Sequence, residues 1–497
     1  MRINKIVIDN FKNVVHGELS FENKRRPDGP SILALYGQNG SGKSALIDSI
    51  LAFKLLLMGD ELPQRFADFI NKEAEFARFV FIFDTGTTPI KYEVEFGNDD
   101  GFPRIINETV RIAGSDTNRF RTIFTTDGYE HFGPKSLLQT MSKEDINDME
   151  CCHRRGASFF FSSKESFVEV KNERGTRSIK MTTDPFPADS DCTWVAELAY
   201  VEAEAYLYVV GTKEAENIES GRLTIPYDYI NTGIVFEPEP VEVDGGYGVF
   251  EYAVDREGVW NAVDVSTDPN NSLPIPYELC VTLEDGLFKS VNYILEQLVP
   301  GMSVRLANAE DAHVIVDGIP MANVYIESCR ENYSIPLSCE SRGVQKLVSI
   351  AWLLVNVYNN PNFVAVIDEI DSGVFEYLLG EILKTIAEGG EGQLICTSHN
   401  LRPLEVIDKG YIAFTTTNPE NRYMRLKNVK STNNLRDFYY RSIFLGGQKE
   451  SIYEPASSGD LSMGFIMANS GLHGLNDEKA DEDLREDQQQ IEGNMLS

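Results

Sequence analysis

The chain has 497 residues, of which 42% are hydrophobic, and a formal net charge of −32 at pH 7. This length is enough for about two to four domains, and the charge disfavours a protein whose main task is to grip duplex DNA, because phosphate contacts need a basic field. The longest apolar run, residues 348–357, is far short of the ~20 residues that span a bilayer. Seven cysteines without a CxxC pair fit a reducing compartment. We therefore expect a cytoplasmic protein with free thiols and no membrane partner.

The N-terminal residues predict the first half of an α/β domain. Apolar positions indicate strands at 3–11, 19–21 and 31–36, and the third strand runs straight into a glycine-rich loop that opens a helix over 44–57. Further on, residues 78–83 and 91–96 predict the two strands of a hairpin.

The glycine-rich loop, residues 37–44, reads GQNGSGKS and fits the pattern G-x-x-x-x-G-K-[ST] between a strand and a helix. Backbone N–H groups of such a loop cradle phosphates at a helix N-terminus, where the helix dipole favours negative charge. We expect Lys43 to reach the β- and γ-phosphates of ATP, and Ser44 to bind Mg²⁺. The predicted nucleotide-binding residues of the loop are Gly37, Asn39, Gly40, Gly42, Lys43 and Ser44.

The middle of the chain is acidic and rich in turns. Between residues 181 and 270, nineteen acidic residues face three basic ones, a net charge of −16. This stretch predicts either a well-solvated surface or a docking surface for a basic protein partner. No heptad pattern persists from 118 to 299, so we expect no long coiled coil there.

The C-terminal part recovers clear patterns, with a helix near 290–298, strands between 314 and 326, and a helix over 342–358. A buried strand at 363–367 then ends in Asp368 and Glu369. At the carboxyl edge of a sheet, Asp368 is placed to hold the Mg²⁺ that Ser44 binds, and Glu369 to polarise the attacking water. A further apolar strand ends at His399, which is placed to lie beside the γ-phosphate.

Residues 338–347, SCESRGVQKL, lie just before the helix that leads to the Asp-Glu strand. With the opening INKIVIDNFKNV, they resemble the heads of SMC and RecF proteins and of the bacterial ABC-class AAA family ATPases grouped with the OLD proteins. The resemblance implies that Ser341 and Gly343 contact the γ-phosphate of ATP held by a second subunit, and that Asp371 belongs to the D-loop. The signature lacks the usual di-glycine, and Gln139 is a candidate for the glutamine loop.

The resemblance implies an α/β fold class: an ABC-type P-loop NTPase head with a mixed sheet and flanking helices, interrupted by a large acidic α+β insertion. It divides the chain into an N-terminal half of the head at 1–115, an insertion at 116–299 and a C-terminal half at 300–445. The extension at 446–497 includes an acidic tail after 469 that we expect to be disordered.

The chain is similar in design to the ATPase subunits of two-gene anti-phage systems such as PARIS. It shows no coiled-coil lever, and the 98 residues after His399 leave no room for the nuclease that OLD proteins append. By this resemblance the protein is an ATP- and Mg²⁺-dependent homo-oligomer. It would restrain and release a separate effector protein, a nuclease, when a trigger protein from an invader is sensed.

Two alternatives stay open. One is a RecF-like DNA-repair or DNA-tethering ATPase, and its support is two groups of basic residues: His153, Arg154, Arg155, Lys164, Lys171, Arg174, Arg177 and Lys180, and then Arg422, Arg425, Lys427 and Lys430. The other is an ATPase whose dimerisation alone is the switch. The segment 433–441 favours an amphipathic helix that packs Leu435, Phe438 and Tyr439 over a contact site.

Overall fold

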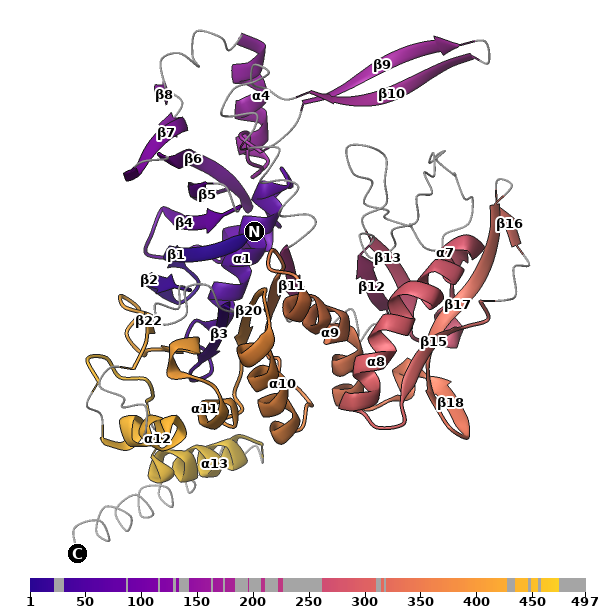
Figure 1. Cartoon of the computed structure of the whole chain (residues 1–497). Helices are drawn as coiled ribbons and strands as arrows, with labels where there is room; N and C mark the ends of the chain where they lie inside the picture. Colours follow the sequence, from indigo (N-terminus) through magenta and orange to yellow (C-terminus); the bar gives the residue numbers. More distant parts are fainter. Residues whose placement is uncertain are drawn as a thin grey trace, which may run out of the picture.

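A computed structural model describes residues 1–21, 31–85, 88–114, 117–127, 131–133, 143–161, 164–172, 175–183, 195, 207–210, 222–226, 262–309, 314–316, 319–426, 434–445, 448–454 and 457–472. A mostly parallel central sheet organises the chain (Figure 1). Its strands, in spatial order, are β11 (Leu207–Val210), β19 (Val364–Ile367), β20 (Gln393–Thr397), β3 (Ser31–Tyr36), β21 (Ile412–Thr415) and β22 (Tyr423–Met424). Only β22 pairs antiparallel among these strands.

The central sheet is covered on both faces, which is why its strands are almost continuously apolar. Along β3, Ile32 and Ala34 belong to one hydrophobic cluster and Leu33 and Leu35 to the other. On the first face lie α9 (Arg342–Asn359), α10 (Glu376–Gly389), α11 (Pro403–Val406) and α12 (Leu435–Leu445). On the second face lies α1 (Lys43–Leu57).

A second, antiparallel sheet covers α1 from the other side. Its order is β2 (Val14–Ser20), β1 (Arg2–Phe11), β4 (Phe76–Asp84), β5 (Pro89–Asp99), β6 (Phe102–Gly114), β7 (Thr117–Asp127) and β8 (His131–Gly133). Phe53 of α1 stacks on Phe81 of β4, with ring centroids 4.3 Å apart. The short helix α2 (Arg65–Asp68) and α4 (Lys143–Arg154) lie against β6. The domain that carries the glycine-rich loop at residues 37–44, the P-loop, thus consists of two sheets with α1 between them.

A third sheet forms a separate lobe beside α9 (Figure 1). Its strands are β12 (Arg222–Pro226), β13 (Ala262–Ser266), β14 (Leu273–Pro276), β15 (Ser303–Ala307), β16 (Val314–Val316), β17 (Ile319–Arg330) and β18 (Tyr333–Pro336). It packs against α7 (Tyr277–Thr282), the π-helix η3 (Leu283–Phe288) and α8 (Lys289–Leu298). Short 3₁₀ turns are η2 (Pro269–Asn271), η4 (Leu337–Cys339) and η5 (Lys409–Tyr411).

The hairpin of β9 (Lys164–Asn172) and β10 (Gly175–Thr183) projects from the body in Figure 1, and α13 (Ser458–Leu472) is the last described helix. The strand–loop–helix unit, the hairpin of β4 and β5, α8, α9 and β19 confirm the local predictions, and the α/β class with mixed sheets and flanking helices is confirmed. The structure adds that β11, inside the range assigned to the insertion, is a strand of the central sheet. The third sheet likewise crosses the expected boundary at residue 300.

No helix in the described part of the chain is both long and apolar enough to cross a membrane. The acidic tail was expected to begin after residue 469, but α13 continues to Leu472, so the prediction was wrong for residues 470–472. The rest of the tail and the glutamine-loop candidate Gln139 lie outside the described residues. Helix α12 buries Leu435 and Tyr439, and Phe438 packs against the same core. Tyr439 stacks on Phe414 with ring centroids 5.1 Å apart, which confirms the packing role predicted for this helix.

Candidate functional site

The P-loop begins at Gly37, directly after β3, and α1 begins at Lys43. Glycine is required at Gly37, because a Cβ there would lie 1.6 Å from Thr415 Oγ1. Gly40 and Gly42 have φ of +73° and +96°, a backbone region that L side chains rarely adopt. The N-cap Gly42 has no side-chain cap, and the first turn of α1 carries no acidic residue. The free N–H groups and positive dipole end of α1 therefore suit an anion.

Lys43 is only 7% exposed, and its Nζ donates to Gly37 O at 2.9 Å and to Gln38 O at 3.1 Å. Burial lowers the pKa of Lys43, and the charges of nearby carboxylates, Asp368, Glu369 and Asp371, oppose that shift. The ammonium is thus bonded to carbonyls of its own loop and lies within the field of the three acids. This arrangement brings together the residues that the sequence places 325 positions apart.

The acids come from the strand next to β20, which itself pairs with β3. Parallel registers align Ile367 with Cys396 and Thr397 with Leu35, so the carboxyl ends of β19, β20 and β3 meet at one edge. Asp368 is 4% exposed and accepts a hydrogen bond from Thr397 Oγ1, which in turn accepts from the backbone N–H of Glu369 at 2.7 Å. The Glu369 side chain is exposed. The buried acid and the exposed acid thus have different surroundings.

Asp371 connects the loop that follows β19, residues 368–373 (the acidic loop), to the segment that carries His399. Its Oδ2 accepts from the backbone N–H groups of His399 at 2.9 Å and Asn400 at 2.8 Å. Its Oδ1 is buried without a hydrogen-bond partner. The His399 side chain is exposed at the same edge. Asp371 therefore fixes the backbone that presents His399.

Ser341 and Gly343 lie at the start of α9. Ser341 is the N-cap and accepts from the Val344 N–H at 3.4 Å. Gly343 packs so closely on the turn after Asp371 that a Cβ would lie 2.0 Å from Gly373 O. In the part of the chain that the structure describes, neither forms a hydrogen bond with the P-loop of its own chain. The structure brings them to the acidic loop instead, with Ser341 exposed to solvent.

Several residues that hold the P-loop were missed by sequence reasoning. Asn13 Nδ2 donates to Gly40 O, Tyr423 OH donates to Gly42 O at 2.9 Å, and the Glu454 N–H donates to Gln38 Oε1 at 3.0 Å. The contacts of Tyr423 and Glu454 span 381 and 416 positions, and that of Asn13 spans 27, so no local pattern predicts them. The opening NFKN, which contributed to the resemblance, was the only available signal.

Two arginines of the proposed basic clusters, Arg422 and the half-buried Arg425, donate to backbone carbonyls. Arg422 is 6% exposed and donates to the carbonyls of Thr416, at 2.7 Å, and Asn13. Arg425 donates to Gly410 O, Ile412 O and Ser20 O. The interpretation of these arginines as phosphate-binding residues was wrong, because their guanidinium groups are occupied by backbone carbonyls. The neighbouring Lys427 and Lys430 lie outside the described residues.

His153, from the other basic cluster, is fully buried. Its Nε2 lies 3.1 Å from Glu108 Oε2, and Glu108 also accepts from Tyr92 OH at 2.9 Å and from Ser158 Oγ. Burial is the main cause that raises the pKa of Tyr92 well above its usual value. This network joins β5, β6 and α4, so His153 has a structural role and is not part of a basic surface.

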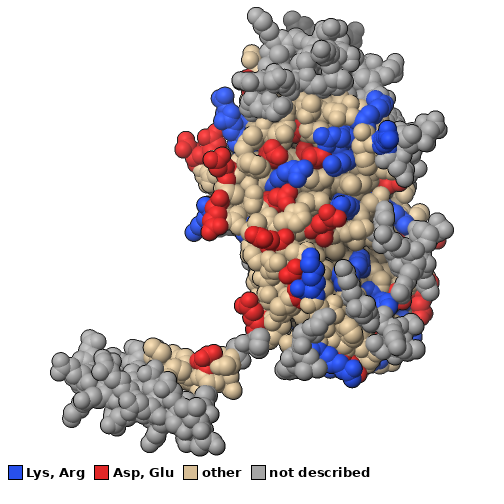
Figure 2. All heavy atoms as spheres, turned by 90° about the vertical axis from the view of Figure 1, so that its left-hand side faces the viewer, with Lys and Arg blue, Asp and Glu red and all other residues tan. Residues whose placement is uncertain are grey.

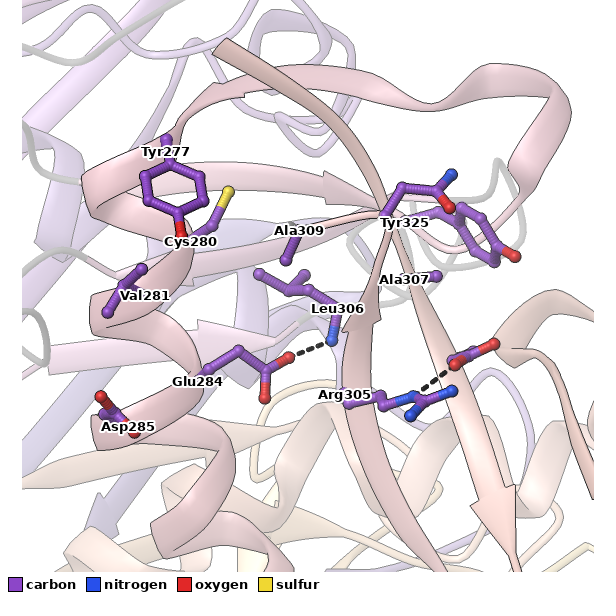
Figure 3. A pocket seen from close by; sticks show the side chains of 12 residues that line it. Tyr277, Cys280, Val281, Glu284, Asp285, Arg305, Leu306, Ala307, Ala309 and Tyr325 are labelled. Carbon is purple, nitrogen blue, oxygen red and sulfur yellow. Dashed lines mark hydrogen bonds and ion pairs between the residues drawn. The ribbon is translucent and has the colours of Figure 1, made fainter. Parts of the chain in front are cut away.

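A cavity of about 670 Å³ lies away from this edge, between the α7–η3 segment and β15 of the third-sheet lobe (Figure 3). Tyr277 and Tyr325 lie on opposite sides of it, Glu284 accepts from the Leu306 N–H, and Arg305 pairs with Glu327. None of the predicted site residues lines this cavity. The P-loop edge is therefore the candidate site.

The residues at that edge fit ATP and Mg²⁺. An uncapped helix start and a buried lysine suit phosphates, and the exposed Ser44 hydroxyl and the Asp368 carboxylate are oxygen ligands of the kind that Mg²⁺ prefers. The orphaned Asp371 Oδ1 shows that the polar groups of the edge are not satisfied within the chain.

Similar solved structures include the SmcHead bound to the C-winged helix domain of ScpA, which is 15% identical, covers 86% of this chain and 98% of its own, and has a TM-score of 0.41. The SMC head domain from Thermotoga maritima is 15% identical, covers 86% and 100%, and has a TM-score of 0.36. The Smc head domain with an extended coiled coil, bound to the C-terminal domain of ScpA and derived from Pyrococcus furiosus, is 13% identical, covers 86% and 96%, and has a TM-score of 0.36.

No curated protein matches the sequence. Residues 5–184 match a protein family described as an AAA domain, a range that includes the whole P-loop, α1 and all but the first residues of the sheet that covers α1.

Proposed function

We propose that this protein binds and hydrolyses ATP with Mg²⁺ at the edge formed by β3, β19 and β20. The observation that carries the proposal is the convergence of Lys43, Asp368 and Glu369, which the parallel registers and the charges acting on Lys43 place together. The N-terminal end of α1 and Lys43 would bind the phosphates, and Ser44 and Asp368 would hold Mg²⁺. Glu369 is exposed and would accept a proton from the attacking water.

Hydrolysis would depend on a second copy of the chain. Ser341 is exposed at the start of α9 and, among the described residues, forms no hydrogen bond with the P-loop of its own chain. We propose that Ser341 and Gly343 complete the site of a partner copy, with ATP between the two heads, and that Asp371 and His399 transmit its state. The protein would then be a homo-oligomer that assembles with ATP.

The cycle of ATP binding and hydrolysis would control the release of a separate effector protein. We propose that the acidic chain restrains an effector protein, a nuclease, in bacterial anti-phage defence and releases it when an invader's protein is sensed. The net charge of −16 between residues 181 and 270 supports a basic protein partner.

The RecF-like alternative would require a surface for DNA. The guanidinium groups of Arg422 and Arg425 donate to backbone carbonyls, and the buried His153 contacts Glu108. On the face shown in Figure 2, Lys and Arg are interspersed with Asp and Glu. Arg78 forms ion pairs with Asp9 and Glu93. These observations favour a protein partner, so DNA binding is the weaker candidate.

The test of the chemistry is ATP turnover by the purified protein, measured as phosphate release with and without Mg²⁺. We expect Lys43→Ala to lose nucleotide binding, and Glu369→Gln to bind ATP normally but to turn over at least about a hundredfold more slowly. Lys384→Ala on α10 is the matched control and should behave as wild type. Turnover in Glu369→Gln equal to wild type would contradict the proposed role of Glu369.

The test of the partner is a pull-down of tagged Glu369→Gln from the native host with ATP present, in lysate with and without a broad nuclease. We expect a stoichiometric protein that survives nuclease treatment. Recovery of DNA without such a protein, lost steeply as salt rises, would support the RecF-like alternative.

A further inference from the structure

Lys346 lies in the second turn of α9, directly beneath the acidic loop. It is only 7% exposed, and its Nζ donates to the backbone carbonyl of Asp368 at 3.3 Å. Burial lowers its pKa, and the carboxylates of Asp368, Glu369 and Asp371 oppose that shift. Its ammonium is therefore close to the same three acids that act on Lys43, but it approaches them from α9 and not from the P-loop.

A lysine at this position is not explained by packing. Its neighbours Leu347 and Ile350 are buried apolar residues of the same helix, and an apolar side chain would fill the site without desolvating a charge. The ammonium gains its compensation from the carbonyl and from the field of the acids. Its charge is thus matched to the acidic loop.

Helix α9 holds the acidic loop at two points. Its first turn meets the loop where Gly343 packs against Gly373, and its second turn meets it where Lys346 bonds to Asp368. The loop between these points is a tight turn, with Ser372 N–H bonded to Glu369 O at 2.9 Å and φ of +46° at Glu369. The same helix begins at the exposed Ser341. A displacement of the exposed end of α9 would therefore move both ends of the acidic loop.

We propose that Lys346 is a positioning residue that couples the start of α9 to the acids of its own chain. When Ser341 engages nucleotide held by a second copy, α9 would carry Lys346 and set the backbone of Asp368, and thus the placing of Glu369. This inference rests on the proposed ATPase function. It adds a residue through which association of the two copies would increase the rate of ATP hydrolysis.

The test is a double-mutant cycle on ATP turnover with Ser341→Ala, Lys346→Met and the double variant. Methionine keeps the length and apolar stem of lysine and removes the charge. We expect each single change to lower kcat about tenfold with KM for ATP changed less than about twofold, and the double variant to be about as slow as the single ones. Lys384→Met is the matched control and should keep wild-type kcat.

Additive effects, with the double variant slowed about a hundredfold, would show that Lys346 acts independently of Ser341 and would overturn the proposal, as would normal kcat in Lys346→Met. Thermal melts check that each variant is folded. Should Lys346→Met not fold, Lys346→Arg keeps the charge and enters the same cycle, with a smaller loss of kcat that must again be non-additive with Ser341→Ala. If the wild-type protein binds ATP but does not hydrolyse it, both the proposed function and this inference are contradicted. Additive effects of the two substitutions contradict only the inference.

Discussion

Glu108 shows at the residue scale how one buried carboxylate joins several parts of the chain. It is fully buried and accepts from Tyr92 OH, Ser158 Oγ and the Phe159 N–H, the last at 3.2 Å, and its Oε2 lies 3.1 Å from His153 Nε2. These partners belong to β5, to α4 and to the segment that follows α4. A carboxylate suits this site because both of its oxygens only accept hydrogen bonds.

We predict that Glu108→Gln lowers the free energy of unfolding by about 2–4 kcal/mol, because an amide N–H₂ would face donors in a buried site. Urea unfolding followed by fluorescence measures the change. Glu73→Gln, at an exposed position, is the control and should stay within about 0.5 kcal/mol of wild type. A Glu108→Gln variant as stable as the control would contradict the structural role of this network.

Burial also separates the cysteines by reactivity. Burial raises the pKa of the Cys280 thiol to about 11 and that of the Cys396 thiol still further, whereas Cys151 and Cys339 are exposed. The thiolate is the reactive form, so buried cysteines with raised pKa values should react slowly near neutral pH. We predict that iodoacetamide at pH 8 labels Cys151 and Cys339 before Cys280 and Cys396, as read by mass spectrometry, and that urea removes the difference. Early labelling of Cys396 in the folded protein would contradict the placing of β20 in the core.

At the element scale, the parts that follow local patterns were predictable and the parts held by distant contacts were not. The P-loop and β19 were predicted because each combines an apolar strand with a distinct polar ending. Strand β11 was missed because four residues inside an acidic stretch carry too little periodicity, and its place in the sheet is set by pairing with β19. Arg422 was misread because only the fold shows that it bonds to carbonyls. The trans roles of Ser341 and Gly343 remain predictions.

The contact between α9 and the acidic loop gives a prediction at this scale. In Gly343→Ala the added Cβ would meet the Gly373 carbonyl at 2.0 Å, so either the start of α9 or the loop must shift. We expect ATP binding to be kept within about threefold and kcat to fall at least about tenfold, measured by nucleotide titration and phosphate release. Gly464→Ala in α13, where a Cβ meets nothing within 4 Å, is the control. Normal kcat in Gly343→Ala would show that this close packing is not needed for turnover.

At the scale of the whole molecule, α1 and α9 pack on the same central sheet, and we propose that the P-loop and the exposed end of α9 act on the nucleotides of different copies. The P-loop would hold a nucleotide of its own chain, while Ser341 is exposed to solvent. An interface of two copies related by a two-fold axis satisfies both, because each copy then offers its α9 to the other's nucleotide. Oligomerisation should therefore depend on ATP and on Ser341 together.

We predict that Glu369→Gln with ATP and Mg²⁺ elutes at about twice the 55.8 kDa of the chain, measured by light scattering after size exclusion, and as a single copy without nucleotide. The reason is that blocked hydrolysis keeps the nucleotide that joins the two copies, by the mass-action stabilisation that any bridging ligand provides. Adding Ser341→Arg should prevent the shift while ATP binding stays normal, because an arginine at this exposed position obstructs only the partner's nucleotide. Lys384→Arg on α10 is the matched control. If the ATP-dependent increase in mass persists in the variant with Ser341→Arg, the interface does not include Ser341. If the mass is the same with and without nucleotide, assembly does not depend on ATP bound at the P-loop.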